Sequence, residues 1–265
     1  MNIRIRLETP ADHYAVEELT REAFWKIHWG DGQQICDEHL LVHKLRKSPF
    51  FVPELNFVAE IGGKLVGHII YSKSRIETDL GEVYETLTFG PISVLPEHQN
   101  MGIGKKLMRH TFEEAKRLGY RAVIIFGHPD YYPRVGFRRA AEYGITTSDG
   151  RTFDPFMAYP LYDGALDGIH GRYYIDPVYD SLTQEDTLEF DKKFPPKERH
   201  IHQPIDVLLD RLEPNAAKAI QGLDCKSLTF MKTKSEREIR SLPDVDDKAV
   251  ETIRAVMLEH GMRWG

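Results

Sequence analysis

The stretch His98–Leu107, HQNMGIGKKL, decides the fold prediction, because it puts two glycines in the first turn of an otherwise strong helix. Apolar residues recur at helical spacing from Ile103 to Leu118, and Gly119 then stops the helix. A long strand, Val83–Pro96, precedes the stretch, and the apolar run Ala122–Phe126 follows it as a buried strand. The order strand, glycine loop, helix, strand predicts a crossover unit with two parallel strands side by side.

The glycine loop predicts an anion site. The first amides of a helix have no partner within the helix and carry the positive end of its dipole. Gly102 and Gly104 have no Cβ, so a ligand can approach the backbone closely, and Lys105 and Lys106 add positive charge. Phosphate suits such a site best. The pattern is neither a P-loop nor a full GxGxxG motif, and a simple tight turn before a helix remains the alternative.

The chain before this unit is predicted to form one strand, then two helices, then a hairpin of two strands. Residues 3–7, IRIRL, alternate apolar and charged side chains as a strand does. Helices are predicted from Ala11 to about Trp29 and from Asp37 to Arg46. Two β-rich runs, NFVAE and KLVGHIIYSKSRI, joined by Gly62-Gly63, predict a hairpin. Gly90-Pro91 should disturb the ladder of the next strand, because proline has no N–H to donate.

Two motifs together resemble one enzyme family. The run Gln99–Gly104, QNMGIG, fits the Q/R-x-x-G-x-G/A signature of the GNAT N-acetyltransferases, and Tyr131–Phe137, YYPRVGF, resembles the family's Tyr-x-x-x-Gly-Phe element. The resemblance extends from residue 1 to roughly 200 and includes the segment DPFMAYPLYDGALDG. It implies an α+β chain: a three-layer α/β GNAT fold with a mixed central sheet over residues 1–188. A linker over 189–203 and a small all-α domain over 204–265 complete the expected organisation.

The resemblance also implies a cofactor, acetyl-CoA. In this family the strand before the glycine loop is splayed from its neighbour, and pantetheine lies in the gap. Backbone bonds to pantetheine are then expected from Ile92 and Val94, and an N–H near Ile92 would polarise the thioester carbonyl. The phosphates are expected on the loop and the helix start: Gln99, Asn100, Met101, Gly102, Ile103, Gly104 and Lys105.

For catalysis, the resemblance implies direct attack of a neutral amine on the thioester in a ternary complex, without a covalent enzyme intermediate. Tyr132, four residues before Gly136, matches the family's acid, which protonates the leaving thiolate; a packed aromatic is the alternative. Glu85 and His128 are candidate bases, although each also fits an ordinary polar residue. A water relay can replace a single base. The sequence indicates a packing role for Tyr131.

The composition of the chain limits which partners, membrane segments and cellular location we expect. The 265 residues carry a net charge of −6, which gives no electrostatic reason to expect nucleic-acid binding. No run reaches the ~18 apolar residues of a membrane span. The charged, alternating start MNIRIRLETP is unlike a signal peptide, and the two cysteines, Cys36 and Cys225, exclude a disulfide framework, so we expect a cytoplasmic protein. The cysteines should be small buried hydrophobes.

Other candidate sites are weaker. His200 and His202 lack partners at metal-ligand spacing, so no metal is expected. No nucleophile motif is present in the sequence. Phe24, Trp25 and Trp29 recur on the first predicted helix, where they fit a core or a contribution to the acceptor site that this helix borders in the family.

The C-terminal segment is wholly helical in pattern, with Pro214 at one helix start, Ser235 as a cap and a final amphipathic helix over Asp246–Gly261. Residues 225–265 resemble the C-terminal domain of the bacterial RNA polymerase alpha subunit, a helical bundle with helix-hairpin-helix character. Where that family has Gly-Lys-Lys, this chain has Asp246-Asp247-Lys248, which opposes contact with phosphate. Residues 201–265 hold ten Lys/Arg against eleven Asp/Glu. We therefore favour contact with a protein partner or self-association over DNA binding, with a purely structural appendage also open.

The sequence thus predicts an acetyl-CoA-dependent N-acetyltransferase acting on a small-molecule or peptide amine. The alternative is an acyl-CoA-binding regulatory protein whose helical tail contacts a partner. Neither the acceptor nor the oligomeric state can be read from the sequence, although a homodimer is the common outcome.

Overall fold

The computed structural model describes residues 2–25, 35–197, 204–223, 225, 227–231 and 234–260. They form two compact units, which are treated separately below. Unit 1 comprises Met1–Phe24 and Asp37–Asp191, and unit 2 comprises Trp25–Cys36 and Lys192–Gly265. The first unit therefore ends close to the predicted domain boundary at residue 188.

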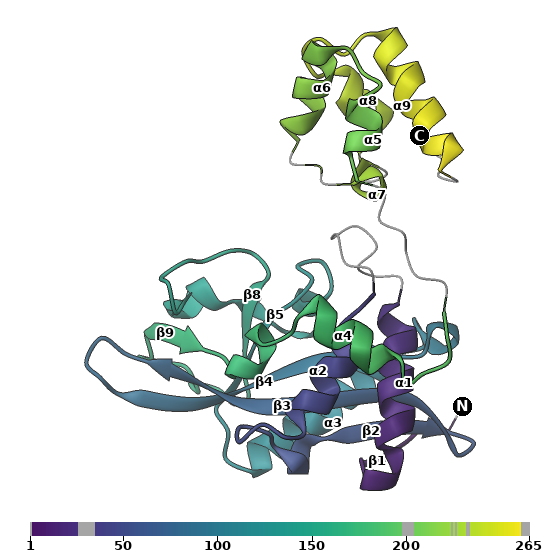
Figure 1. The fold of residues 1–265 in the computed structure, drawn as a ribbon. Coiled ribbons are helices and arrows are strands. Elements are labelled where there is room, and N and C mark those ends of the chain that lie inside the picture. The colour runs from purple at the N-terminus through teal and green to yellow at the C-terminus, as the bar shows by residue number, and fades with distance from the viewer. Residues whose placement is uncertain are drawn as a thin grey trace. The chain divides into compact units, whose positions relative to one another are not determined.

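Unit 1 is built on one mixed sheet of nine strands (Figure 1). The strands are β1 Arg4–Leu7, β2 Phe57–Ile61, β3 Lys64–Glu77, β4 Val83–Val94, β5 Ala122–Phe126, β6 Arg138–Arg139, β7 Ile145–Thr147, β8 Phe156–Pro160 and β9 Gly171–Tyr174. Their order is β1-β2-β3-β4-β5-β8-β6, and β9 pairs with both β3 and β7. The pairs β4–β5 and β7–β9 are parallel, whereas the other pairs are antiparallel.

Helices cover both faces of this sheet. They are α1 His13–Phe24, α2 Glu38–Leu45, α3 Ile103–Arg117 and α4 Gln184–Asp191. Neighbouring residues of β3 show the two faces: Ile69 packs in the core that includes α3, and Ile70 packs with residues of α1 and α2. The predicted three-layer fold with a mixed sheet is therefore confirmed (Figure 1).

Most predicted elements of unit 1 are confirmed within one or two residues, and α1 differs most. The sequence predicted a helix to about Trp29, but α1 ends at Phe24. Trp29 itself lies outside the described residues. Trp25, just after the helix, is buried, as a core residue would be.

The crossover unit is present, and its two parallel strands separate. The pairing of β4 with β5 has a single register pair, Leu87 with Val123, so the rest of β4 runs on without β5 beside it. The pairing of β4 with β3 also slips between Ile69 and Tyr71, opposite Gly90-Pro91. Both observations agree with the disturbance and the splay predicted for this strand.

Helix α3 lies close against the sheet at the splayed end of β4. A Cβ placed on Gly67 of β3 would lie only 3.0 Å from the Cγ2 of Ile103, so glycine lets the first turn of the helix reach the strand. Ile103, Leu107 and Ala115 are buried along the inner face of α3. Gly119 ends the helix region with a φ of +87°, a conformation that favours glycine. This packing fixes the helix N-terminus beside β4.

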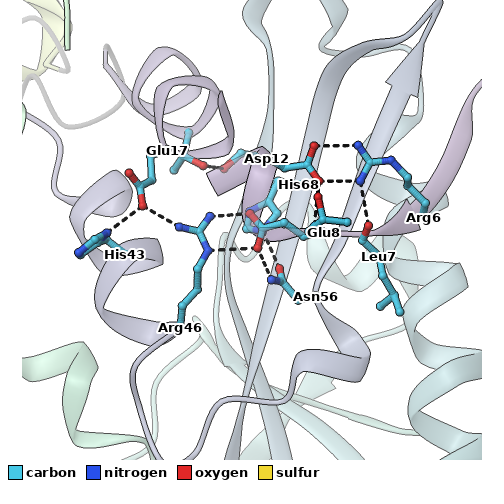
Figure 2. Close-up of polar contacts among 12 residues, drawn as sticks. Arg6, Leu7, Glu8, Asp12, Glu17, His43, Arg46, Asn56 and His68 are labelled. Atoms are coloured by element: carbon cyan, nitrogen blue, oxygen red, sulfur yellow. Dashed lines mark hydrogen bonds and ion pairs between the residues drawn. The ribbon is translucent and has the colours of Figure 1, made fainter. Parts of the chain in front are cut away.

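A layer of charged side chains lies between the sheet and the helices α1 and α2 (Figure 2). The Arg46 guanidinium donates to both Glu8 oxygens, at 2.5 and 3.1 Å, and to Glu17 at 2.6 Å. Glu17 also contacts the ring of His43 at 2.9 Å. All but His43 are at least nine-tenths buried at their side chains. One arginine therefore neutralises two buried carboxylates and ties both helices to the segment that follows β1.

His68 of β3 extends this layer into the sheet (Figure 2). Its Nε2 lies 2.8 Å from the Asn56 Oδ1, and the Asn56 amide in turn donates to Glu8. The Nδ1 has no hydrogen-bond partner among the described residues. Burial lowers the pKa of His68 to about 4, with Glu8 opposing that shift and Arg46 and His13 adding to it. His68 is therefore neutral in the folded protein near pH 7.

A buried ion pair stabilises the C-terminal end of unit 1. Arg21 of α1 donates to both oxygens of Asp191, at 2.5 and 3.0 Å, and the His39 Nε2 lies 3.3 Å from the same carboxylate. Burial alone would raise the pKa of Asp191, but hydrogen bonds from His39 and Arg21 outweigh it and lower the pKa to about 2. The pair joins residues 170 positions apart in the chain and anchors α4 to α1.

Unit 2 is helical over the residues that the structure describes after position 203. Its helices are α5 Asp206–Leu209, α6 Pro214–Gln221, α7 Leu228–Met231, α8 Glu236–Arg240 and α9 Asp247–Glu259. They enclose a core of their own, in which Leu208, Ile239 and Ile253 are fully buried. The predicted proline start of α6 and the Ser235 cap of α8 are both confirmed. The predicted closure of α9 at Gly261 lies outside the described residues.

The two aspartates between α8 and α9 have structural partners. Asp246 caps α9 by accepting from the Ala249 N–H at 2.8 Å, and Asp247 pairs with Arg240. The two cysteines, Cys36 and Cys225, are buried, as predicted. Within the described ranges, no helix is both long and apolar enough to cross a bilayer.

Candidate functional site

The glycine loop opens α3 in a left-handed turn. Asn100 and Gly102 have φ values of +61° and +79°, and Gly102 serves as the N-cap without any side-chain cap. The first helical hydrogen bond along this turn runs from the Lys106 N–H to the Gly102 oxygen at 3.0 Å. The amides of Ile103, Gly104 and Lys105 precede it and have no partner within the helix. They are therefore available to an anion.

Gly104 forms the floor of a small niche beside these amides. A Cβ placed on Gly104 would lie 3.6 Å from the Ile92 Cδ1, 3.7 Å from the Tyr131 Oη and 3.8 Å from the Val94 Cγ2. These are ordinary contact distances, so the niche admits one small group without strain. It joins the end of β4 to the start of α3, and Tyr131 closes it from the β5 side.

The backbone of β4 faces the splay at the predicted positions. The Leu95 N–H donates to the Val66 oxygen at 3.0 Å, and hydrogen-bonded positions alternate along an antiparallel pair. Ser93 therefore also directs its backbone groups to β3, whereas Ile92 and Val94 direct theirs to the open side. The Gln99 side chain donates to the Val94 oxygen at 3.1 Å, so one lone pair of that carbonyl is in use.

Tyr132 lies deeper, against the core. Its ring packs on Phe89 and Phe137, with centroid distances of 6.0 and 5.4 Å. A Cβ on Gly127 would come within 2.4 Å of this ring, so a glycine is needed there. Burial raises the pKa of Tyr132, and its hydroxyl has no hydrogen bond to any described residue. The ring therefore packs against the core, while the hydroxyl is left without a hydrogen-bond partner among the described residues.

The two candidate bases lie differently. Glu85 is exposed, pairs with Lys73 at 3.1 Å and stands before the Leu87 position at which β4 and β5 pair. Seven residues of strand separate it from Ile92, roughly 20 Å at 3.3 Å per residue. His128 lies two residues after the end of β5, and its carbonyl accepts the Tyr131 and Tyr132 N–H groups, but its ring is 71% exposed. The structure thus brings His128 near the two tyrosines and leaves Glu85 apart from the glycine loop.

The remaining predicted positions fall on or outside this site. Asn100, Met101 and Lys105 are exposed around the loop, and Ile103 is buried beneath it. His200 and His202, rejected as metal ligands from the sequence, lie outside the described residues. Among the residues that the structure does describe, no group of three or more His, Cys, Asp or Glu side chains is placed to hold a metal ion.

Comparison with known proteins gives consistent matches for unit 1. Residues 17–138 match the model of the acetyltransferase (GNAT) family. The structure of YhbS from Escherichia coli in complex with CoA is 25% identical, with a TM-score of 0.59, and covers 69% of this chain and 94% of that chain. A GNAT acetyltransferase from Brucella melitensis in complex with acetyl-CoA is 27% identical, with a TM-score of 0.52, covering 68% and 99%.

Unit 1 has the GNAT fold. In sequence the chain is 34% identical over 101 residues to the uncharacterized N-acetyltransferase YjhQ of Escherichia coli K12, covering 38% of this chain. It spans only about half, 55%, of the length of YjhQ. It is 28% identical over 168 residues to the uncharacterized N-acetyltransferase YhbS of the same strain, covering 63% of this chain and 92% of that protein. These matches support placing unit 1 among the GNAT N-acetyltransferases and support acyl transfer in general.

The place of the Tyr131 hydroxyl was not predicted from the sequence. Tyr131 was predicted to pack, and its ring does meet the Tyr132 ring edge-on, but the residue is 42% exposed and its hydroxyl lies at the niche over Gly104. Its position next to Tyr132 in the motif was the available signal. Two adjacent side chains after a strand point in different directions, so only the three-dimensional turn shows which of them reaches the helix.

Proposed function

We propose that this chain is an N-acetyltransferase that moves the acetyl group of acetyl-CoA to an amine. The observation that carries the proposal is the unpaired edge of β4, which leads at Ile92 and Val94 directly to the open amides of α3. Two structures with the same fold hold CoA or acetyl-CoA, which supports this cofactor here. No metal is part of the proposal.

The cofactor would lie along this edge. Pantetheine takes the place of a neighbouring strand beside Ile92 and Val94, where β5 has moved away. The pyrophosphate then meets the amides of Ile103, Gly104 and Lys105 at the positive end of the α3 dipole. The loop residues Gln99, Asn100, Met101 and Gly102 wrap the same phosphates.

The reaction needs a neutral amine and a stabilised leaving group. The amine nitrogen attacks the thioester carbonyl, the backbone N–H near Ile92 stabilises the oxyanion, and the C–S bond then breaks. The ammonium proton leaves through water or His128, and Tyr132 donates its proton to the CoA thiolate. Burial raises the pKa of Tyr132, so its hydroxyl keeps its proton near pH 7 and is able to donate it.

A thiol-release assay over a panel of amines tests this function. We expect CoA to appear from acetyl-CoA only with some amines, and small metabolites, peptide N-termini and lysine peptides should all be included. A Gly104→Gln variant is the control, because the niche over Gly104 is the proposed cofactor site. Tight acetyl-CoA binding with no turnover on any amine would contradict the enzyme assignment.

That last result would favour a second function, an acyl-CoA-binding regulator. The observation behind it is unit 2, whose separate helical core is not needed for the GNAT fold. In this proposal the first unit senses the cofactor and the helical unit contacts a partner. Turnover separates the two functions, since a regulator binds acetyl-CoA without consuming it.

For unit 2 we propose contact with a protein partner or a second copy of the chain. Its resemblance to the RNA polymerase alpha C-terminal domain and to helix-hairpin-helix modules rests on sequence alone. Asp246 and Asp247, at the place of the phosphate-facing residues, are engaged within the unit, which disfavours DNA. A gel shift on AT-rich duplex at low salt tests the DNA alternative, and sedimentation tests self-association. We place the protein in the cytoplasm.

A further inference from the structure

Tyr131 reaches across the splay from the opposite wall. It follows β5, whereas Ile92 and Val94 belong to β4 and Gly104 belongs to α3. Its Oη lies 3.7 Å from the position of a Cβ on Gly104. The Tyr131 phenol therefore lies at the point where the splay meets the start of α3.

The environment of this phenol is unlike that of Tyr132. The Tyr131 ring meets the Tyr132 ring edge-on at 5.1 Å. The side chain is 42% exposed, and no described residue hydrogen-bonds to its hydroxyl. The ring therefore packs in the fold, whereas the hydroxyl makes no hydrogen bond to a described residue. Packing alone does not require that oxygen.

A group resting on Gly104 lies within reach of this hydroxyl. Because Gly104 has no Cβ, the Tyr131 Oη lies close to the helix backbone, 3.7 Å from the position that a Cβ would take. A ligand oxygen in contact with the backbone beside this position can come within the about 2.7 Å of an O–H to oxygen hydrogen bond from that hydroxyl. The open amides of Ile103, Gly104 and Lys105 border the same space, so the group there is expected to be anionic.

We propose that Tyr131 is a cofactor-positioning residue that donates its hydroxyl to a pyrophosphate oxygen of CoA above Gly104. The inference rests on the proposed function and adds a side-chain donor from the β5 side to the backbone donors of α3. Tyr131 thereby closes the outer end of the pantetheine channel. Tyr132, one residue on, acts at the inner end, so the two tyrosines divide binding and proton donation.

The test compares two ligands against two variants. CoA carries the pyrophosphate and pantetheine lacks it, and their affinities for the full chain are measured by calorimetry, with pantetheine competing against CoA. Tyr131→Phe removes an oxygen that makes no bond in the fold, so folding is not at issue, and a thermal melt verifies this. Tyr162→Phe is the matched control, because Tyr162 has a similar exposure of 38% and lies outside the niche.

We expect Tyr131→Phe to weaken CoA binding roughly tenfold or more, as for the loss of a hydrogen bond to a charged group. Pantetheine binding and the Tyr162→Phe variant should be unchanged. An unchanged CoA affinity, or an equal loss for CoA and pantetheine, overturns the inference while the proposed function stands. If the wild-type chain binds no CoA at all, the proposed function itself has failed.

Discussion

Replacing His68 should flatten the dependence of stability on pH. His68 is fully buried and its pKa is lowered to about 4 by that burial, against 6.5 in an unfolded chain. Between these values the unfolded state binds a proton that the folded state does not. The stability is therefore fully present above pH 6.5 and is lost progressively as the pH falls toward 4.

The size of this loss follows from the two pKa values. The difference between 6.5 and about 4, at about 1.36 kcal/mol per unit, gives a loss of about 3 kcal/mol below pH 4. At pH 5 the same linkage gives about 2 kcal/mol. These are large fractions of the 5–15 kcal/mol that is typical of a domain, so the effect is measurable.

Urea unfolding followed by circular dichroism between pH 7.5 and 4.5 provides the assay. His68→Gln is the variant, because glutamine can keep a donor toward the Asn56 oxygen, which accepts from His68 at 2.8 Å. The variant is expected to lose stability at pH 7.5 but to lack about 2 kcal/mol of the further loss that the wild type shows by pH 5. Parallel pH profiles for the two proteins would refute the reasoning.

Three further predictions concern the site and the core. Tyr132→Phe should cut kcat strongly and leave acetyl-CoA affinity intact; unchanged turnover removes Tyr132 from the mechanism. Gly127→Ala places a Cβ within 2.4 Å of the Tyr132 ring and should also lower kcat, with no additional loss when combined with Tyr132→Phe. Asp191→Asn leaves the buried Arg21 without its charge partner and should lower the free energy of unfolding by about 3–5 kcal/mol. Asp186→Asn, which breaks an exposed pair, should cost at most about 1 kcal/mol; equal losses in urea unfolding would contradict the burial argument.

Local patterns in the sequence predicted the crossover unit of unit 1, and the three-layer fold followed from the resemblance of two motifs to the GNAT family. The glycine loop, the periodicity of α3 and the apolar run of β5 each read correctly, and together they specify one crossover. Gly90-Pro91 also marked the place where β4 becomes irregular. These signals are short-range, so a single sequence carries them.

Long-range polar contacts were not predictable in the same way. Arg21 and Asp191 lie 170 residues apart, and neither stands out among the many charged residues of the chain. The same holds for Arg46, which joins Glu8 to Glu17 beneath α1 and α2. Burial of a charge depends on the finished packing, and periodicity does not report it.

The site residues were predictable from the sequence only in part. The motif gave the positions of the backbone donors, but the direction of each side chain depends on the turn after β5. That turn sends Tyr132 into the core and leaves the Tyr131 hydroxyl over Gly104. Glu85 was chosen for its strand, and the structure places it on the paired part of β4 beside Lys73.

Calorimetric titration with acetyl-CoA tests the central claim most directly, using the wild type, Gly104→Glu and Gly104→Gln. The contacts around Gly104 are ordinary at 3.6 to 3.8 Å, so both variants should fold, and they differ only in charge. The account predicts that the wild type binds acetyl-CoA, that the glutamine variant binds it more weakly, and that the glutamate variant does not bind it. Equal binding by all three proteins, or none by the wild type, would contradict the assignment of the α3 N-terminus as the cofactor site.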